Sequence, residues 1–173
     1  MVKKKDKSLK LVSQVDYKIY TEYCNFHTIK VEKLDRLGLI YVLGIVLILF
    51  LYKINVNVTY YIYIYIGLAI FCILLFLVRN YEMKKYYKSA EDLLNSETVY
   101  EFNDNDLYVC DKYGQSRLPY DNFYKVMETN TALYIYITNK QSFIIDKKQN
   151  DLDTLVKVTV LLQKNTNYES YVK

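Results

Sequence analysis

Side chains suited to metal or redox chemistry are few in this chain. The only histidine, His27, lies three residues after Cys24, and the three cysteines include no Cys-x-x-Cys pair. A structural zinc ion takes four Cys or His ligands, so a zinc site would need every candidate, including Cys72 inside an apolar run. Free thiols in a reducing compartment are the favoured interpretation. The sequence therefore predicts no metal and no cofactor.

Two Asp-x-Asp pairs are the remaining candidates for cation binding or acid–base chemistry. Asp104 and Asp106 fall where a turn is expected, and Asp151 and Asp153 fall where a helix should start. Both positions favour carboxylates for structural reasons, and neither pair has a third acidic residue to complete a cation site. The chain has no nucleophile elbow, Walker loop, Rossmann fingerprint or zincin motif, and it has only four glycines. We therefore expect a protein that is not an enzyme.

Four basic residues are candidates for contact with an anionic ligand or a partner: Lys112, Arg117, Lys147 and Lys148. A phosphate pocket needs Lys and Arg clustered on the loops between strands. Here those loops carry mainly Asp and Asn, and residues 96–173 hold 9 Lys/Arg against 11 Asp/Glu. This balance favours an unidentified protein partner, with recognition of anionic lipid or its headgroup as the alternative.

Two apolar segments predict how such a domain is held in place. Residues 37–52 and 59–78 carry no charge, and the second, as a helix, would be roughly 30 Å long, which matches the hydrocarbon thickness of a bilayer. The first extends to residue 54 if Lys53 reaches the far interface. The alternative is a pair of buried helices, but a soluble helix normally keeps a polar face. We therefore predict a transmembrane hairpin of residues 37–54 and 59–78.

The charges that flank the hairpin predict its orientation. Nine Lys/Arg precede the first run, Arg79, Lys84, Lys85 and Lys88 follow the second, and the link contains only Lys53. Positive residues stay on the cytoplasmic side, which predicts a cell-membrane protein with two spans and both termini in the cytoplasm. Basic residues interleaved with tyrosines also occur in nucleic-acid-binding proteins. Beside a membrane exit they favour lipid contact and no nucleic acid.

The stretch YYIYIYIG, residues 60–67, alternates as a half-buried strand would. A lone strand in hydrocarbon leaves its backbone N–H and C=O groups unpaired, whereas a helix pairs them internally. The stretch also runs on into eleven further apolar residues, so we expect a helix. The residues expected at the two membrane interfaces are Lys53, Tyr60, Tyr61, Tyr63 and Tyr65 at the outer one, and Arg79, Lys84 and Lys85 at the inner one.

The rest of the chain predicts short strands and two further helices. Residues 9–20 alternate as a strand, and an amphipathic helix is expected from Thr21 as its N-cap, with His27 as an interfacial residue rather than a ligand or a base. Six short strands between residues 98 and 146 are typical of an antiparallel meander. A last helix is expected after Asn150 as its N-cap, with a buried face of Leu152, Leu155, Val156, Thr159 and Leu162.

Several of these features resemble a known family, the YcxB-like proteins of bacteria. The resemblance covers roughly residues 14–162, including the TEYCNFH helix, and depends mostly on apolar positions. Its most specific residues are the acidic turn of Asp104 and Asp106, the pair Tyr120 and Asp121, and the paired Ile144 and Ile145; Asp146 departs from the proline often found there. The resemblance implies a pleckstrin-homology-like fold, a bent antiparallel sheet closed by a C-terminal helix. It implies no activity and no catalytic residue.

The expected organisation is an α+β membrane protein that presents a cytoplasmic domain to a partner. Its parts are an N-terminal strand and helix (1–36), the hairpin (37–78), a cytoplasmic helical extension (79–95), the YcxB-like domain (96–165) and a tail (166–173).

Overall fold

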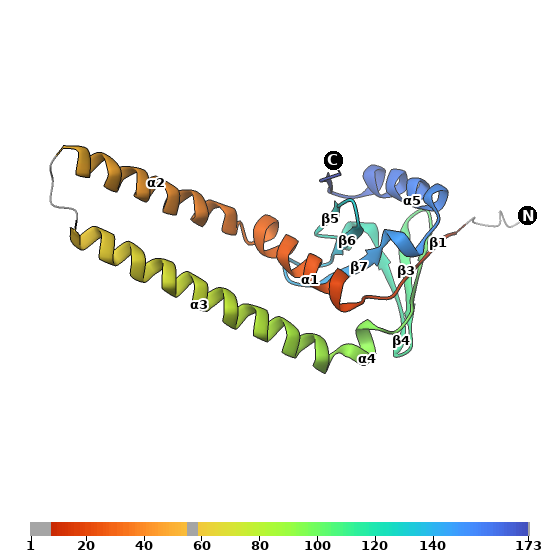
Figure 1. The fold of residues 1–173 in the computed structure, drawn as a ribbon. Coiled ribbons are helices and arrows are strands. Elements are labelled where there is room, and N and C mark those ends of the chain that lie inside the picture. The colour runs from red at the N-terminus through yellow and green to blue at the C-terminus, as the bar shows by residue number, and fades with distance from the viewer. Residues whose placement is uncertain (1–7, 55–58, 173) are drawn as a thin grey trace, which may run out of the picture. The chain divides into compact units, whose positions relative to one another are not determined.

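The computed structural model describes residues 8–54 and 59–172. The basic segment 3–7 and most of the predicted link between the apolar runs (55–58) lie outside the described residues. The chain divides into two compact units (Figure 1), which we call the sheet unit (Met1–Tyr23 with Ala90–Lys173) and the helical unit (Cys24–Ser89). The finer domain boundaries stay predictions.

The sheet unit contains two four-stranded sheets. The first has the order β1-β2-β3-β4, with β1 Leu9–Ser13, β2 Thr98–Phe102, β3 Asp106–Asp111 and β4 Gly114–Pro119. The second has the order β7-β6-β5-β8, with β5 Lys125–Glu128, β6 Ala132–Tyr136, β7 Ser142–Asp146 and β8 Tyr168–Ser170. Neighbours are antiparallel except β5 and β8, which are parallel. The six predicted strands are confirmed, but they divide between two sheets instead of forming one meander.

The chain changes sheets at a short 3₁₀ helix, Tyr120–Asn122, that follows Pro119. Proline has no backbone N–H with which to continue a ladder, so β4 ends there. The side chain of Tyr120 is 4% exposed, and its hydroxyl donates to the carbonyl of Asn103 at 2.6 Å. This buried tyrosine fixes the corner between the two sheets.

One hydrophobic core joins the two sheets and helix α5 (Leu152–Asn165). Its buried side chains include Leu11, Phe102, Leu107, Val126, Ile135, Ile145, Val158 and Leu162. Burial raises the pKa of the Tyr100 phenol in this core, so that ring stays uncharged. All five residues of β6 are buried, and Tyr23 covers its other face with a ring centroid 5.4 Å from that of Tyr134.

Helix α1 (Tyr17–Phe26) begins four residues before the predicted start at Thr21. The carboxylate of Asp16 accepts the N–H of Ile19 at 2.7 Å, as an N-cap side chain does. Thr21 lies inside the helix instead and donates its hydroxyl to the carbonyl of Tyr17. The predicted strand over residues 9–20 therefore ends at Ser13, and its last residues are helical.

The N-cap of α5 is Asp151, not Asn150 as predicted. The Asp151 side chain accepts the N–H of Thr154 at 2.8 Å, and this bond lowers the pKa of its carboxyl. Asn150 has a long-range role instead: it accepts the N–H of Val12 on β1 and donates to the carbonyl of the same residue, both at 2.7 Å. It therefore attaches β1 to the start of α5.

The buried face of α5 differs from the predicted one. Leu155 and Leu162 are buried as expected, but Val158 lies between them on that face. Leu152 and Val156 are 75% and 53% exposed, so the prediction is wrong for both. The helix packs on the row at i, i+3 and i+7, and the neighbouring row at i, i+4 and i+8 is left in solvent.

The helical unit contains the π-helical turn His27–Val31, helix α2 (Leu34–Lys53) and helix α3 (Thr59–Ser89). The stretch YYIYIYIG is helical, as predicted. Helix α3 is long and apolar enough to cross a membrane, and its apolar stretch is not buried in the protein. The apolar stretch of α2, Gly38–Lys53, is shorter. Figure 1 shows α2 and α3 running alongside each other in opposite directions.

Candidate interaction surfaces

A half-buried polar cluster lies at the end of β5. The Glu128 carboxylate accepts hydrogen bonds from Lys147 Nζ and from the Tyr168 hydroxyl, both at 2.5 Å. Lys147 lies in the short helix Lys147–Gln149 and also donates to the carbonyl of Thr129 at 2.7 Å. The side chains of Lys147 and Glu128 are 18% and 13% exposed. The cluster thus joins β5, the segment after β7, and β8.

The cluster determines the charge state of Glu128. Burial raises the pKa of this carboxyl, but the hydrogen bonds from Lys147 and Tyr168 outweigh burial, so its pKa lies below the usual 4.5. The Tyr168 phenol has the opposite shift, because burial and the bond to Glu128 raise its pKa above the usual 10.0. At neutral pH the cluster is an ion pair with a neutral tyrosine.

These shifts predict a pH dependence of stability. A carboxyl whose pKa is depressed by folding contributes stability above its unfolded pKa, and this contribution is lost as the pH falls through the folded value. We expect the free energy of unfolding to decrease below about pH 4.5, the ordinary pKa of glutamate, and to depend less on pH in Glu128→Gln. Urea unfolding between pH 3 and 7, followed by tyrosine circular dichroism, measures this; parallel profiles would contradict the assignment.

A cleft of about 220 Å³ adjoins the polar cluster. Its lining consists of Glu128, Lys147 and one side of α5, namely Leu152, Leu155, Val156, Thr159, Val160 and Gln163. Three of these form an exposed row at i, i+4 and i+8, which we call the α5 stripe: Leu152 (75% exposed), Val156 (53%) and Val160 (59%). An aliphatic surface beside a polar anchor suits contact with another protein better than contact with water.

The four predicted contact residues lie in two different parts of the sheet unit. Lys112 and Arg117 belong to the β3–β4 hairpin, whereas Lys147 and Lys148 follow β7. Arg117 Nε is 2.8 Å from Asp106, and Lys147 pairs with Glu128, so both are used in ion pairs. Lys112 lies over the Tyr113 ring at 4.9 Å, and Lys148 is exposed. The structure thus divides them instead of grouping them into an anion pocket.

The acidic candidates have structural contacts. Asp106 accepts bonds from Asn103 Nδ2 and Arg117 Nε in the β2–β3 turn, at 2.7 and 2.8 Å, and Asp151 caps α5. Within residues 8–54 and 59–172, no group of three His, Cys, Asp or Glu side chains is placed to hold a metal ion. His27 lies 4.0 Å from the Glu32 carboxylate. These arrangements fit turns, caps and surface pairs.

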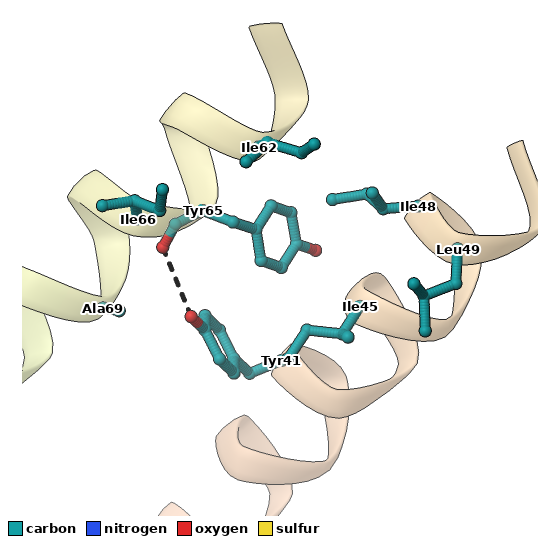
Figure 2. A pocket seen from close by; sticks show the side chains of 8 residues that line it. All are labelled: Tyr41, Ile45, Ile48, Leu49, Ile62, Tyr65, Ile66 and Ala69. Atoms are coloured by element: carbon teal, nitrogen blue, oxygen red, sulfur yellow. Dashed lines mark hydrogen bonds between the residues drawn. The ribbon is translucent and has the colours of Figure 1, made fainter. Parts of the chain in front are cut away.

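In the helical unit, Tyr65 packs between α2 and α3. Figure 2 shows its ring pointing from α3 towards α2, beside Ile48 and Tyr41. The ring centroids of Tyr65 and Tyr41 are 5.3 Å apart, and the Tyr41 hydroxyl donates to the carbonyl of Tyr65 at 3.3 Å. The ring fits because Gly44 has no side chain: a Cβ there would lie 1.5 Å from the Tyr65 hydroxyl oxygen.

The other residues predicted for the membrane interfaces are on the surface of the helical unit. Tyr60, Tyr61 and Tyr63 are 82%, 50% and 69% exposed. Lys53 at the end of α2 and Lys84 and Lys85 on α3 are also exposed, while Arg79 donates to the side-chain oxygen of Asn25. Their contact with lipid stays a prediction.

Sequence reasoning missed Glu128 and Tyr168, which hold the cluster together. Tyr168 lies in the predicted tail, where NYESYV, residues 167–172, has apolar residues only at 168, 171 and 172 and so lacks the alternation of a strand. The three-residue strand β8 is therefore formed through its pairing with β5 and carries no local signal in the sequence.

The comparisons with known proteins agree with part of this structure. Residues 102–157 match the model of the family described as YcxB-like protein, whereas no curated protein and no solved structure matches the chain. The matched segment runs from the last residue of β2 into α5, so it includes Glu128 and Lys147 but neither β1 nor β8. The sequence resemblance is thus confirmed over a narrower range than the predicted 14–162: residues 102–157 of this chain are similar to the YcxB-like family.

Proposed function

We propose that this protein is a non-catalytic, membrane-anchored module whose cytoplasmic sheet unit binds a protein partner. The observation that carries the proposal is the α5 stripe. Leu152, Val156 and Val160 expose three adjacent aliphatic side chains beside the cleft at Glu128, although neighbouring positions of the same helix are buried. An exposed aliphatic row is unfavourable in water and is stabilised when a partner covers it.

The membrane anchor is the helix pair α2 and α3. Helix α3 has the length and composition of a membrane span. In the proposal α2 is the second span, because it packs against α3 through Tyr41 and Tyr65 and because its own apolar stretch ends at Lys53, which can reach the interface. The basic residues on both flanks favour a hairpin with both termini in the cytoplasm.

The pleckstrin-homology-like assignment of the sheet unit is part of the same proposal. Two mainly antiparallel sheets around one core, closed by the C-terminal helix α5, support it, as does the YcxB-like match. The fold alone does not determine a ligand. Between a protein and a lipid headgroup, the dispersed basic residues favour a protein, since Arg117 and Lys147 are already in ion pairs.

The test is photo-crosslinking in the membranes of cells that express the full chain. A photoreactive amino acid at Val156 is expected to give a discrete protein adduct, identified by mass spectrometry, and the same amino acid at Tyr113 on the β3–β4 turn is expected to give none. Leu152→Glu should abolish the adduct, and because Leu152 is 75% exposed, the change in stability should be within about 0.5 kcal/mol. Phospholipid adducts at Val156 would support the lipid alternative and contradict the proposal.

A further inference from the structure

The edge of β5 is covered by the chain's own C-terminal segment. β8 pairs in parallel with β5 over three residues, with Tyr168 opposite Val126 and Ser170 opposite Glu128. Two backbone bonds at 2.8 Å flank the pairing, from Val126 N–H to the Asn167 carbonyl and from Tyr171 N–H to the Glu128 carbonyl. An extended segment therefore already occupies this edge, and its contacts show what the edge accepts.

Tyr168 makes the main side-chain contact of β8. Its ring packs against the hydrophobic core, and its hydroxyl donates to Glu128 Oε2 at 2.5 Å. Ser170 approaches the same oxygen at 3.4 Å, at the limit of a hydrogen bond. The site therefore accepts an aromatic ring that ends in a donor, at a fixed position in an extended backbone.

The attachment of β8 is short and leaves the adjoining surface uncovered. Parallel pairing is slightly weaker per residue than antiparallel pairing, and only three residues take part. With β8 in place, the α5 stripe is still between 53% and 75% exposed, although it lines the same cleft as Glu128. A longer segment that paired with β5 and also covered the α5 stripe would gain contacts that β8 does not make.

A second copy of this chain is a poor source of that segment. Only Thr166 and Asn167 separate the end of α5 from the start of β8, and two extended residues span at most about 7 Å. Thr166 is also fixed, since its N–H and hydroxyl donate to the Leu162 carbonyl at 2.9 and 2.7 Å. The tail therefore reaches its own β5 and cannot extend to another molecule unless α5 moves.

We propose that the edge of β5 beside α5 is a peptide-binding site, occupied here by β8, that accepts an extended segment of another protein with a tyrosine in the place of Tyr168. Strand addition to a sheet edge supplies backbone hydrogen bonds, and the side-chain contacts supply specificity. This inference rests on the proposed function and specifies its mode of binding. The tail acts as an internal competitor, because its short tether gives it a high effective concentration.

The test measures binding of a fluorescent peptide with the sequence NTNYESYV, residues 165–172, to the full chain in detergent micelles. The Tyr171→Pro variant lacks the backbone N–H that donates to the Glu128 carbonyl, so we expect β8 to be released at its exposed end without a change in the core. We expect the peptide to bind this variant at least about tenfold more tightly than the wild type, because the internal competitor is weakened. The peptide carrying Tyr168→Phe should bind about tenfold more weakly than the parent peptide, because it lacks the donor to the Glu128 carboxylate.

Amide hydrogen exchange locates the peptide. Binding should protect the amides of Val126 and Glu128, which face the β8 edge of β5. The β2 amides should exchange equally slowly in the variant and the wild type, which shows that the sheet unit is folded. Equal affinities for the two chains, no binding to Tyr171→Pro, or a peptide that leaves β5 exchange unchanged would each overturn the inference. A dimer of Tyr171→Pro in light scattering would show that a second copy fills the edge and would also overturn it. The crosslinking experiment at Val156 does not depend on the peptide experiment. A protein adduct at Val156 would therefore still support the proposed function if the peptide did not bind at β5.

Discussion

Replacing Lys147 by Met is expected to lower the free energy of unfolding of the sheet unit by about 3 kcal/mol, near the lower end of the range for removing one partner of a buried ion pair. The reason is the environment of Glu128, whose side chain is 13% exposed and whose nearest cation is Lys147 at 2.5 Å. Methionine fills a similar volume but donates nothing, so the carboxylate would be left charged with Tyr168 as its main donor. Urea unfolding of the full chain in micelles, followed by tyrosine circular dichroism, measures the change.

Lys148→Met is the matched control, because this neighbour is exposed and bonds Asp146 only through its backbone N–H among the contacts described for it. Its effect should be within about 0.5 kcal/mol. The double variant Lys147→Met with Glu128→Gln should recover much of the loss, since the unpaired charge is gone. Equal small effects of Lys147→Met and Lys148→Met would mean that the pair contributes nothing.

Two similar stretches of sequence show how far local pattern predicts this fold. YYIYIYIG in α3 and LYIYIT, residues 133–138, around β6 have nearly the same alternation, yet one is a helix and the other is mainly strand. Length and flanking residues separate them: the first continues into an apolar run, and the second is bounded by polar turns. Those signals are local, so the sequence predicted both elements correctly.

Long-range contacts account for what the sequence could not predict. Glu128 meets Lys147 and Tyr168, which are 19 and 40 residues further along the chain, and Asn150 meets Val12 across 138 residues. Asn150 is a suitable N-cap by type, but its bonds to β1 leave Asp151 to cap the helix. Which residue caps α5, and which side chains pair, depends on which strands become neighbours. The periodicity of apolar residues along the chain does not predict that arrangement.

Long-range packing also explains why the exposed face of α5 was not predicted from the sequence. The apolar residues of this helix occupy two adjacent rows, and hydrophobicity alone cannot show which row meets the sheets. The structure buries Leu155, Val158 and Leu162 and leaves the row of Leu152 exposed. Both rows are apolar, and the error in the predicted face concerns the row of Leu152, Val156 and Val160, to which we assign the proposed partner.

Replacing Gly44 by Leu is the second change with a large expected effect, a loss of about 1–3 kcal/mol in the stability of the α2–α3 pair, as for overpacking elsewhere. An added Cβ would lie 1.5 Å from the Tyr65 hydroxyl oxygen and 2.6 Å from its Cζ, so the ring would have to move. Moving it separates Tyr65 from Tyr41, and with that the aromatic contact between the helices is lost (Figure 2). Titration of the micelle-solubilised chain with dodecyl sulfate, followed by far-ultraviolet circular dichroism, measures the loss.

Gly67→Leu makes the same substitution on α3, where a Cβ meets nothing within 4 Å. Both changes raise helix propensity by the same amount, so the difference between them isolates the clash. In a Tyr65→Ala background Gly44→Leu should cost little, because the two sites are coupled through the ring. If Gly44→Leu and Gly67→Leu have equal effects, α2 and α3 do not pack through Tyr65. The main contact that supports α2 as the second helix of a membrane hairpin would then be absent.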